Sequence, residues 1–142
     1  MGRLIAFDIG DKRIGIAVSS LVGDLAMPLE TYFRKNIRSD IEYLVKIAEE
    51  KGADTIVCGL PVNFDGSESV QTVKTREFID KLAEKTNIPI VTTDERFTTL
   101  EARRLLIEAD MGRDKRKQVI DKVAASYILE GYMNRSKSNE RK

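Results

Sequence analysis

The apolar positions in the first 33 residues fall into three short runs separated by polar or glycine-containing turns. These runs are Arg3–Asp8, Arg13–Ser20 and Leu25–Phe33. They are rich in Ile, Val and Leu and shorter than most helices, so each predicts a β-strand. Because Pro28 has no backbone donor, the third strand is expected at a sheet edge or with a bulge. The short connections predict an antiparallel meander.

The spacing of apolar residues changes to a helical period after residue 36, with Ser39 as the expected N-cap of a helix that stops at Gly52. Strand-like and helix-like segments then alternate. The predicted elements are a helix over 37–48, a strand over Asp54–Leu60, a helix over 70–83, a strand over Ile88–Thr93, and two helices over Leu100–Ala109 and Asp114–Tyr132.

This order of elements predicts one α/β domain over residues 1–134. Its core is a five-stranded mixed sheet with the later strands parallel to the first and helices on both faces. Residues 135–142 have nothing to bury and are expected to be a disordered basic tail. Ligands of such sheets bind at the carboxyl ends of the parallel strands, so we expect the functional residues there.

Composition excludes several kinds of site. The chain of 142 residues has no histidine and a single cysteine, Cys58. A histidine-based triad, a Cys–His dyad, a zinc site with histidine ligands and an intrachain disulfide are therefore excluded. No stretch reaches the roughly 20 apolar residues of a membrane span, and the N-terminus does not resemble a signal peptide. We therefore expect a cytoplasmic protein whose chemistry uses carboxylates, cations, hydroxyls or an oxygen-bound metal.

The net charge of +1 conceals an uneven distribution along the chain. Residues 1–95 carry 12 basic and 16 acidic side chains, whereas residues 96–142 carry 12 basic and 7 acidic ones. A basic C-terminal third can face a polyanion. Charge alone favours equally a solvated helical surface followed by a polar tail.

Four acids stand where they can carry chemistry. Asp8 ends the first strand, Asp94 and Glu95 follow the last strand, and Asp121 lies beside the apolar stripe of the final helix. Each also has a structural reading: Asp8 as an acceptor for turn amides, Asp94 as a helix cap, and Asp121 as an exposed acid. Since strand side chains alternate, only one of Asp94 and Glu95 can easily join Asp8.

Clustered carboxylates without histidine suit Mg²⁺ or Mn²⁺, and two such ions activate water for phosphodiester hydrolysis. Cations near these acids offer contacts to a polyanionic backbone. The candidate nucleic-acid-binding cations are Lys12, Arg13, Arg96, Arg113, Lys115, Arg116 and Lys117. The loop over residues 59–67 adds Asn63 and backbone amides before a helix N-terminus, a setting that can hold a phosphate. A plain turn with an N-cap explains that loop equally well.

Four motifs resemble the YqgF family of Holliday-junction-resolvase-like proteins. The motifs are Phe7-Asp8-Ile9-Gly10-Asp11-Lys12-Arg13-Ile14-Gly15-Ile16-Ala17-Val18-Ser19, Cys58-Gly59-Leu60-Pro61-Val62-Asn63-Phe64-Asp65-Gly66, Asp94-Glu95-Arg96-Phe97-Thr98-Thr99 and Ile120-Asp121-Lys122-Val123-Ala124-Ala125. They follow the family's order and the likeness spans residues 3–132.

The resemblance implies an RNase H-like fold and a metal-dependent nuclease that matures the 5′ end of pre-16S ribosomal RNA. Carried over by motif, the catalytic and metal-binding acids are Asp8, Glu95 and Asp121, with Asp94 as the uncertain partner. RNase H-like enzymes usually place an acid at the end of the fourth strand, where this chain has Gly59-Leu60-Pro61. The substitute must come from the fifth strand, about 10 Å from the first, a gap that the longer Glu95 bridges better than Asp94.

Other functions remain open from the sequence. A resolvase of Holliday junctions or other branched DNA is one alternative, and a non-catalytic RNA-binding assembly factor is another. A sugar-kinase-like nucleotide-binding domain normally needs a second lobe, for which 142 residues leave no room. The expected partner is pre-rRNA rather than branched DNA, with a ribosomal particle as a candidate and no membrane. The number of metal ions, endo- or exonucleolytic cleavage, and monomer or dimer are not decided.

Overall fold

The computed structural model describes residues 2–62, 65, 67–94 and 113–140. The elements are β1 (Arg3–Ile9), β2 (Arg13–Ser19), β3 (Ala26–Phe33), α1 (Ile37–Glu50), β4 (Ala53–Leu60), α2 (Val70–Glu84), β5 (Ile90–Asp94) and α4 (Arg113–Glu140). Each of them was predicted within a few residues, apart from the end of α4. The helix predicted over Leu100–Ala109 lies outside the described residues.

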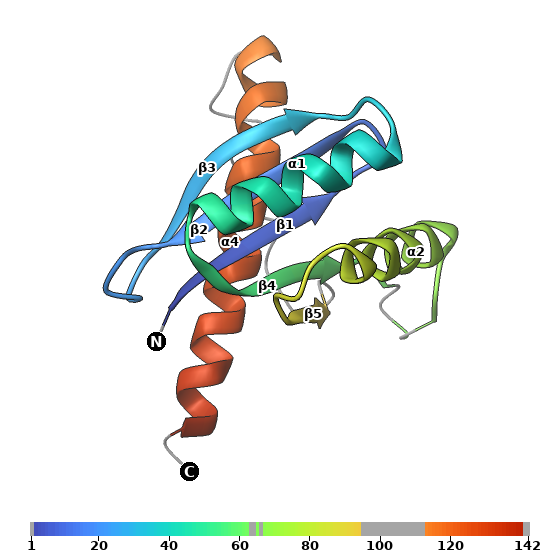
Figure 1. Cartoon of the computed structure of the whole chain (residues 1–142). Helices are drawn as coiled ribbons and strands as arrows, with labels where there is room; N and C mark the ends of the chain where they lie inside the picture. The colour runs from blue at the N-terminus through green and yellow to red at the C-terminus, as the bar shows by residue number, and fades with distance from the viewer. Residues whose placement is uncertain (1, 63–64, 66, 95–112, 141–142) are drawn as a thin grey trace.

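The strands form one mixed sheet in the order β3-β2-β1-β4-β5. β2 is antiparallel to both β1 and β3, whereas β4 is parallel to β1 and to β5. The predicted five-stranded sheet, with a meander followed by parallel strands, is confirmed. β1 is the central strand, so its carboxyl end opens in the middle of the sheet edge (Figure 1).

The edge strand β3 accommodates Pro28 in the two ways that were expected. β3 pairs on one side only, with β2. The register shifts where Ile16 pairs with Glu30 while Ala17 pairs with Pro28, which leaves Leu29 as an extra residue. A proline therefore costs little here, because the strand has a free edge and a bulge.

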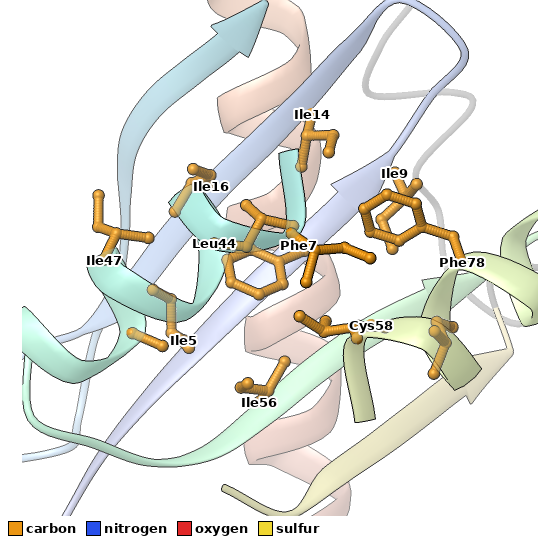
Figure 2. Close-up of a cluster of buried hydrophobic side chains, with 14 of the residues drawn as sticks. Ile5, Phe7, Ile9, Ile14, Ile16, Leu44, Ile47, Ile56, Cys58 and Phe78 are labelled. Atoms are coloured by element: carbon orange, nitrogen blue, oxygen red, sulfur yellow. The ribbon is translucent and has the colours of Figure 1, made fainter. Parts of the chain in front are cut away.

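Helices cover both faces of the sheet, as predicted (Figure 1). Phe7 and its neighbours on alternate positions pack against Leu44 of α1 and Phe78 of α2, as Figure 2 shows. Ala6 and Val57, on the other face, pack against α4. The small residues on that second face let α4 pack closer to the sheet than larger side chains would allow.

Helix α1 begins one turn earlier than its predicted cap. The N-cap is Asn36, whose side chain accepts a hydrogen bond from the backbone N–H of Ser39 at 2.9 Å. Ser39 is therefore the residue that donates to the cap and is not the cap itself. The predicted end is confirmed: Gly52 follows the helix with a φ of 68°, a conformation that favours glycine.

Helix α4 continues through Glu140, so the prediction of a disordered tail was wrong for residues 135–140. The segment contains no Pro or Gly after Gly131. Extending an existing helix needs only one more backbone hydrogen bond per residue fixed, so a polar segment can remain helical without a core to bury. None of the helices in the described ranges has an apolar stretch long enough to cross a membrane.

Candidate active site

Asp8 lies near the carboxyl end of the central strand, on the face covered by α4. Leu4 and Ala6, at alternate positions of the same strand, pack on that face, so Asp8 projects to the same side. The residue is half-buried. Its partner on β2 is Gly15. The strand therefore presents one carboxylate to α4, beside a position that has no side chain.

Gly15 allows α4 to touch the backbone of the sheet. A Cβ added to Gly15 would lie 1.8 Å from the carbonyl oxygen of Asp121 and 2.9 Å from the backbone nitrogen of Lys122. No other residue fits this position without moving the helix. The backbone of Asp121 thus lies over the residue that pairs with Asp8, which brings two of the predicted acids to one place.

Arg13 adds a cation to these two acids. Its Nε donates to Oδ2 of Asp121 at 2.7 Å, and the two side chains are 33% and 20% exposed. Arg13 shares a strand face with Gly15, which is why it reaches α4. The ion pair fixes the carboxylate of Asp121 on the flank of α4, while buried Ala124 and Ala125 form the close contact with the sheet.

The turn between β1 and β2 separates two neighbouring cations. The backbone N–H of Gly10 donates to the carbonyl of Arg13 at 2.9 Å, and a Cβ on Gly10 would lie 2.8 Å from that carbonyl oxygen. Arg13 belongs to the α4 face. Lys12 instead lines a pocket with Ile9 on the opposite side of the sheet. The two predicted nucleic-acid-binding residues therefore serve different faces.

The described end of β5 supplies a hydroxyl rather than an acid to this face. β5 pairs with β4 through Gly59 with Thr93 and through Leu60 with Asp94. Ile90 packs on the face of α1 and α2, so Asp94 takes that side by alternation, opposite the face on which Asp8 lies. Thr93 faces α4, and its hydroxyl is buried without a hydrogen-bond partner among the residues that the structure describes.

Gly59 of β4 lies in the sheet between Asp8 of β1 and Thr93 of β5. Phe7 pairs with Cys58, so Gly59 is the next residue of β4 beside Asp8. The carboxyl end of β4 carries Gly59 and Leu60 in place of an acid, and β5 lies two strands away from β1, both as expected from the sequence. An acid that joins Asp8 from the last strand has to span that interval.

Several predicted site residues cannot be placed. Glu95, Arg96 and Asn63 lie outside the described residues. Four predicted basic residues lie on the first turns of α4, where the structure describes the backbone alone: Arg113, Lys115, Arg116 and Lys117. Within the described ranges no three acids or cysteines gather as a metal site. Asp8 and Asp121 nevertheless provide the oxygen donors that Mg²⁺ and Mn²⁺ prefer.

Two residues of this region were missed in the sequence. Gly15 interrupts a strand of Ile and Val, and an isolated glycine in a strand is a signal of close backbone approach. Thr93 carried no comparable signal, because threonine is common in strands.

Solved structures with similar folds include two resolvases bound to Holliday junctions. The chain is similar to T. thermophilus RuvC in complex with a Holliday junction substrate, with a TM-score of 0.60, 12% identity and coverage of 96% of this chain and 97% of the other. It is also similar to the fowlpox virus resolvase bound to Holliday junction DNA, with a TM-score of 0.55, 14% identity and coverage of 94% and 97%. The fold is thus the RNase H-like fold of RuvC-type resolvases, as predicted.

Sequence relatives define the family more narrowly. Residues 2–135 match the family model described as "RuvX: Holliday junction resolvase". A Clostridium acetobutylicum protein is 45% identical over 93% of this chain and 98% of its own length, and a Halothermothrix orenii protein is 46% identical over 93% and 94%. Both are named "Putative pre-16S rRNA nuclease". The chain belongs to the RuvX family, also known as YqgF, which confirms the resemblance, and the family and the named relatives support a phosphodiester-hydrolysing enzyme.

Proposed function

We propose that this protein is a divalent-metal-dependent nuclease that acts in the cytoplasm on the precursor of 16S ribosomal RNA, at its 5′ end. The names of relatives that align over nearly their whole length support this substrate. The single observation that carries the catalytic assignment is the contact of Gly15 with Asp121, directly beside Asp8. It makes two carboxylates from distant parts of the chain neighbours on one sheet face.

The carboxylates of Asp8 and Asp121, completed by Glu95, are the groups that would hold Mg²⁺ or Mn²⁺. Such ions, when bound, lower the pKa of coordinated water and stabilise the leaving oxygen in phosphodiester hydrolysis. The residues of the chain do the remaining work. Asp8 and Asp121 would hold the cations that offset the negative charge of the attacked phosphate, and Arg13, beside Asp121, would donate to a phosphate oxygen.

Glu95 is the better candidate for the third acid. Asp94 takes the α2 side of β5, whereas Asp8 and Asp121 are on the α4 side. Strict alternation would give the residue after Asp94 the α4 side, which supports Glu95 as the acid that joins Asp8. Glutamate also has the longer side chain, which suits an interval of two strand spacings.

A set of basic and polar residues is proposed to contact the polyanionic backbone of the substrate. The ion pair of Arg13 with Asp121 supports such a role for Arg13. We assign the same general role to Arg96 and Asn63, and to the basic residues at the start of α4: Arg113, Lys115, Arg116 and Lys117. Their contribution is expected to depend on salt concentration, because each phosphate contact releases condensed counterions.

A resolvase of branched DNA is the second candidate, favoured by the description of the matching family. A ribosomal particle rather than free RNA is the expected setting for the first candidate. A non-catalytic assembly factor would bind RNA without any requirement for Asp8. The three functions can be distinguished by the substrate that is bound or cleaved and by whether the carboxylates are required.

The test compares cleavage of a 5′-labelled pre-16S leader transcript with cleavage of a four-way DNA junction, each with Mg²⁺, with Mn²⁺ and with EDTA. Asp8→Asn and Asp121→Asn are expected to lower the metal-dependent rate on the transcript by about a hundredfold or more. Asp80→Asn, at an exposed acid of α2, is the matched control and is expected to cleave normally. Full activity in both site variants contradicts the assignment, and preference for the junction favours the resolvase.

A further inference from the structure

A pocket of about 640 Å³ lies on the sheet face opposite the acids, between the ends of β1 and β3 and the helices α1 and α2. We call it the lysine pocket. Its lining combines cations, apolar groups and three acids. The residues used below are Ile9, Lys12, Phe33, Lys35, Lys74 and Lys81.

The floor of the lysine pocket is held rigidly by a buried ion pair. Arg34 donates from Nε to Oδ2 of Asp40 at 2.9 Å and from Nη1 to the carbonyl of Gly10 at 2.8 Å. Its guanidinium lies 4.8 Å from the ring centre of Phe78. Asp40 is fully buried, and its other oxygen accepts from Tyr32 and from the backbone N–H of Lys35. The charged groups of this floor bond to one another and to the protein backbone, so we expect a ligand to bind to residues of the rim.

The rim carries an excess of positive charge. Lys12, Lys35, Lys74 and Lys81 are all exposed, and none of them forms an ion pair with another described residue. The remaining acids of the lining, apart from Asp40, are Asp11 and Glu77. Four lysines from two connections and helix α2 thus surround the opening, with two acids among them. Such a surface attracts a polyanion.

An exposed aromatic ring stands among these lysines. Phe33 ends β3 and is 59% exposed, although large apolar side chains are usually buried. Aromatic side chains beside cations are the usual platform for unpaired bases, because every base has a stackable face and the cations contact the backbone. An acidic peptide would use the lysines but has no comparable need for the ring. Charge and ring together favour single-stranded nucleic acid.

The pocket adjoins the candidate active site across the end of one strand. Ile9 lines the pocket, and Asp8, the preceding residue, projects to the other face. A single strand of nucleic acid that crosses the carboxyl edge of the sheet would therefore contact both the lysine pocket and Asp8. We propose that the lysine pocket binds a single-stranded segment of the substrate RNA that flanks the cleaved phosphate, an inference that rests on the proposed nuclease function.

The test measures binding without cleavage. Fluorescence anisotropy in EDTA follows labelled oligouridylates of 4, 8 and 12 nucleotides. Phe33→Ala is expected to weaken binding of the longer oligomers about fivefold or more, while Phe33→Trp retains it. Lys74→Gln with Lys81→Gln is expected to lower the slope of log affinity against log salt by about 1.4.

The controls match the variants in exposure and charge. Leu25→Ala removes another apolar side chain, 60% exposed, from the distant β2–β3 turn. Lys46→Gln with Lys85→Gln removes two exposed lysines that are not part of this pocket. Both controls are expected to bind as the wild type does. Pocket variants that bind like their controls overturn the proposal, and so does competition by polyglutamate as strong as that by unlabelled oligouridylate.

Cleavage assays separate this proposal from the function on which it rests. If the lysine pocket binds as described but no RNA is cleaved with Mg²⁺ or Mn²⁺, the nuclease proposal fails and the pocket stands. If Asp8→Asn abolishes cleavage while the pocket variants keep the wild-type KM on long and short RNA, the pocket proposal fails and the nuclease stands.

Discussion

Gly15 and Asp121 are in direct backbone contact, although 106 positions separate them in the chain: a Cβ at position 15 would lie 1.8 Å from the carbonyl oxygen of Asp121. Gly15 also pairs with Asp8 across β1 and β2. One glycine thereby fixes the distance between two carboxylates, because any larger residue pushes α4 away from the sheet.

Gly15→Ala is expected to lower both stability and activity. The added methyl group requires α4 to move, and overpacking of this kind typically costs about 1–3 kcal/mol. Movement of Asp121 away from Asp8 is expected to reduce the cleavage rate at least tenfold, since catalysis depends on the position of both acids. Chemical denaturation and steady-state cleavage measure the two effects.

Gly23→Ala is the control for a glycine replacement. Gly23 has a φ of 77° and no atom within 4 Å of an added Cβ, so the change strains the backbone by about 1–2 kcal/mol without moving α4. Its cleavage rate is expected to remain that of the wild type. Normal cleavage by Gly15→Ala shows that the contact does not position the acids.

The fold was predictable because local patterns agreed with one another. Hydrophobic spacing identified the strands, Pro28 placed β3 at the edge, and the short connections gave the meander. The errors concern ends of helices. Ser39 and Asn36 are both good caps, and only the backbone conformation distinguishes them. The helical residues 135–140 have no apolar pattern from which a helix can be inferred.

The sequence allowed prediction of site residues mainly where an acid follows an apolar strand. Asp8 and Asp94 follow apolar runs, so both were identified, but their faces depend on the register of β1 and β5 in the sheet. The flank position of Asp121 was inferred from helical periodicity. Its depth against the sheet depends on Gly15, and its charge partner Arg13 comes from a distant strand. Such long-range contacts leave no local pattern.

The buried thiol of Cys58 gives a stability prediction independent of activity. Burial raises its pKa to about 12, whereas in the unfolded chain the pKa is about 8.5. Above pH 9 the unfolded chain loses this proton and the folded protein keeps it. The unfolded state then binds fewer protons, so the free energy of unfolding falls as pH rises, by about 1.4 kcal/mol per pH unit from this group.

Cys58→Ala lacks that contribution and serves as the comparison. The stability advantage of the wild type over Cys58→Ala is expected to shrink by about 2 kcal/mol between pH 9 and 10.5. Urea denaturation at each pH measures it. Tyr32 and Tyr43, whose pKa values are also raised by burial, affect both proteins equally. A pH-independent difference means that the thiol does not stay protonated in the folded state.

Arg13 is expected to oppose metal binding while it supports RNA binding. Its guanidinium occupies Oδ2 of Asp121, an oxygen that a metal would use. Because both side chains are partly exposed, the pair is worth up to about 1 kcal/mol. Arg13→Gln is therefore expected to tighten Mn²⁺ binding by up to about fivefold, measured by calorimetry without RNA, and to weaken RNA binding.

Arg38→Gln removes a cation of similar kind from an exposed pair with Glu42 on α1 and is expected to change neither affinity. If Arg13→Gln leaves Mn²⁺ affinity as it is in Arg38→Gln, the metal does not use the carboxylate of Asp121.

The last prediction separates the two adjacent acids after β5. Asp94 pairs in register with Leu60 and takes the side of α1 and α2, away from Asp8. Asp94→Asn is therefore expected to change the cleavage rate less than about threefold, whereas Glu95→Gln is expected to lower it about a hundredfold or more, as the loss of a metal ligand does. Parallel measurement of both variants with Mg²⁺ decides between them, with Asp80→Asn as the control. The opposite result, a large loss in Asp94→Asn with Glu95→Gln active, means that the last strand reaches the metal from the other face and that the alternation of β5 does not govern the site.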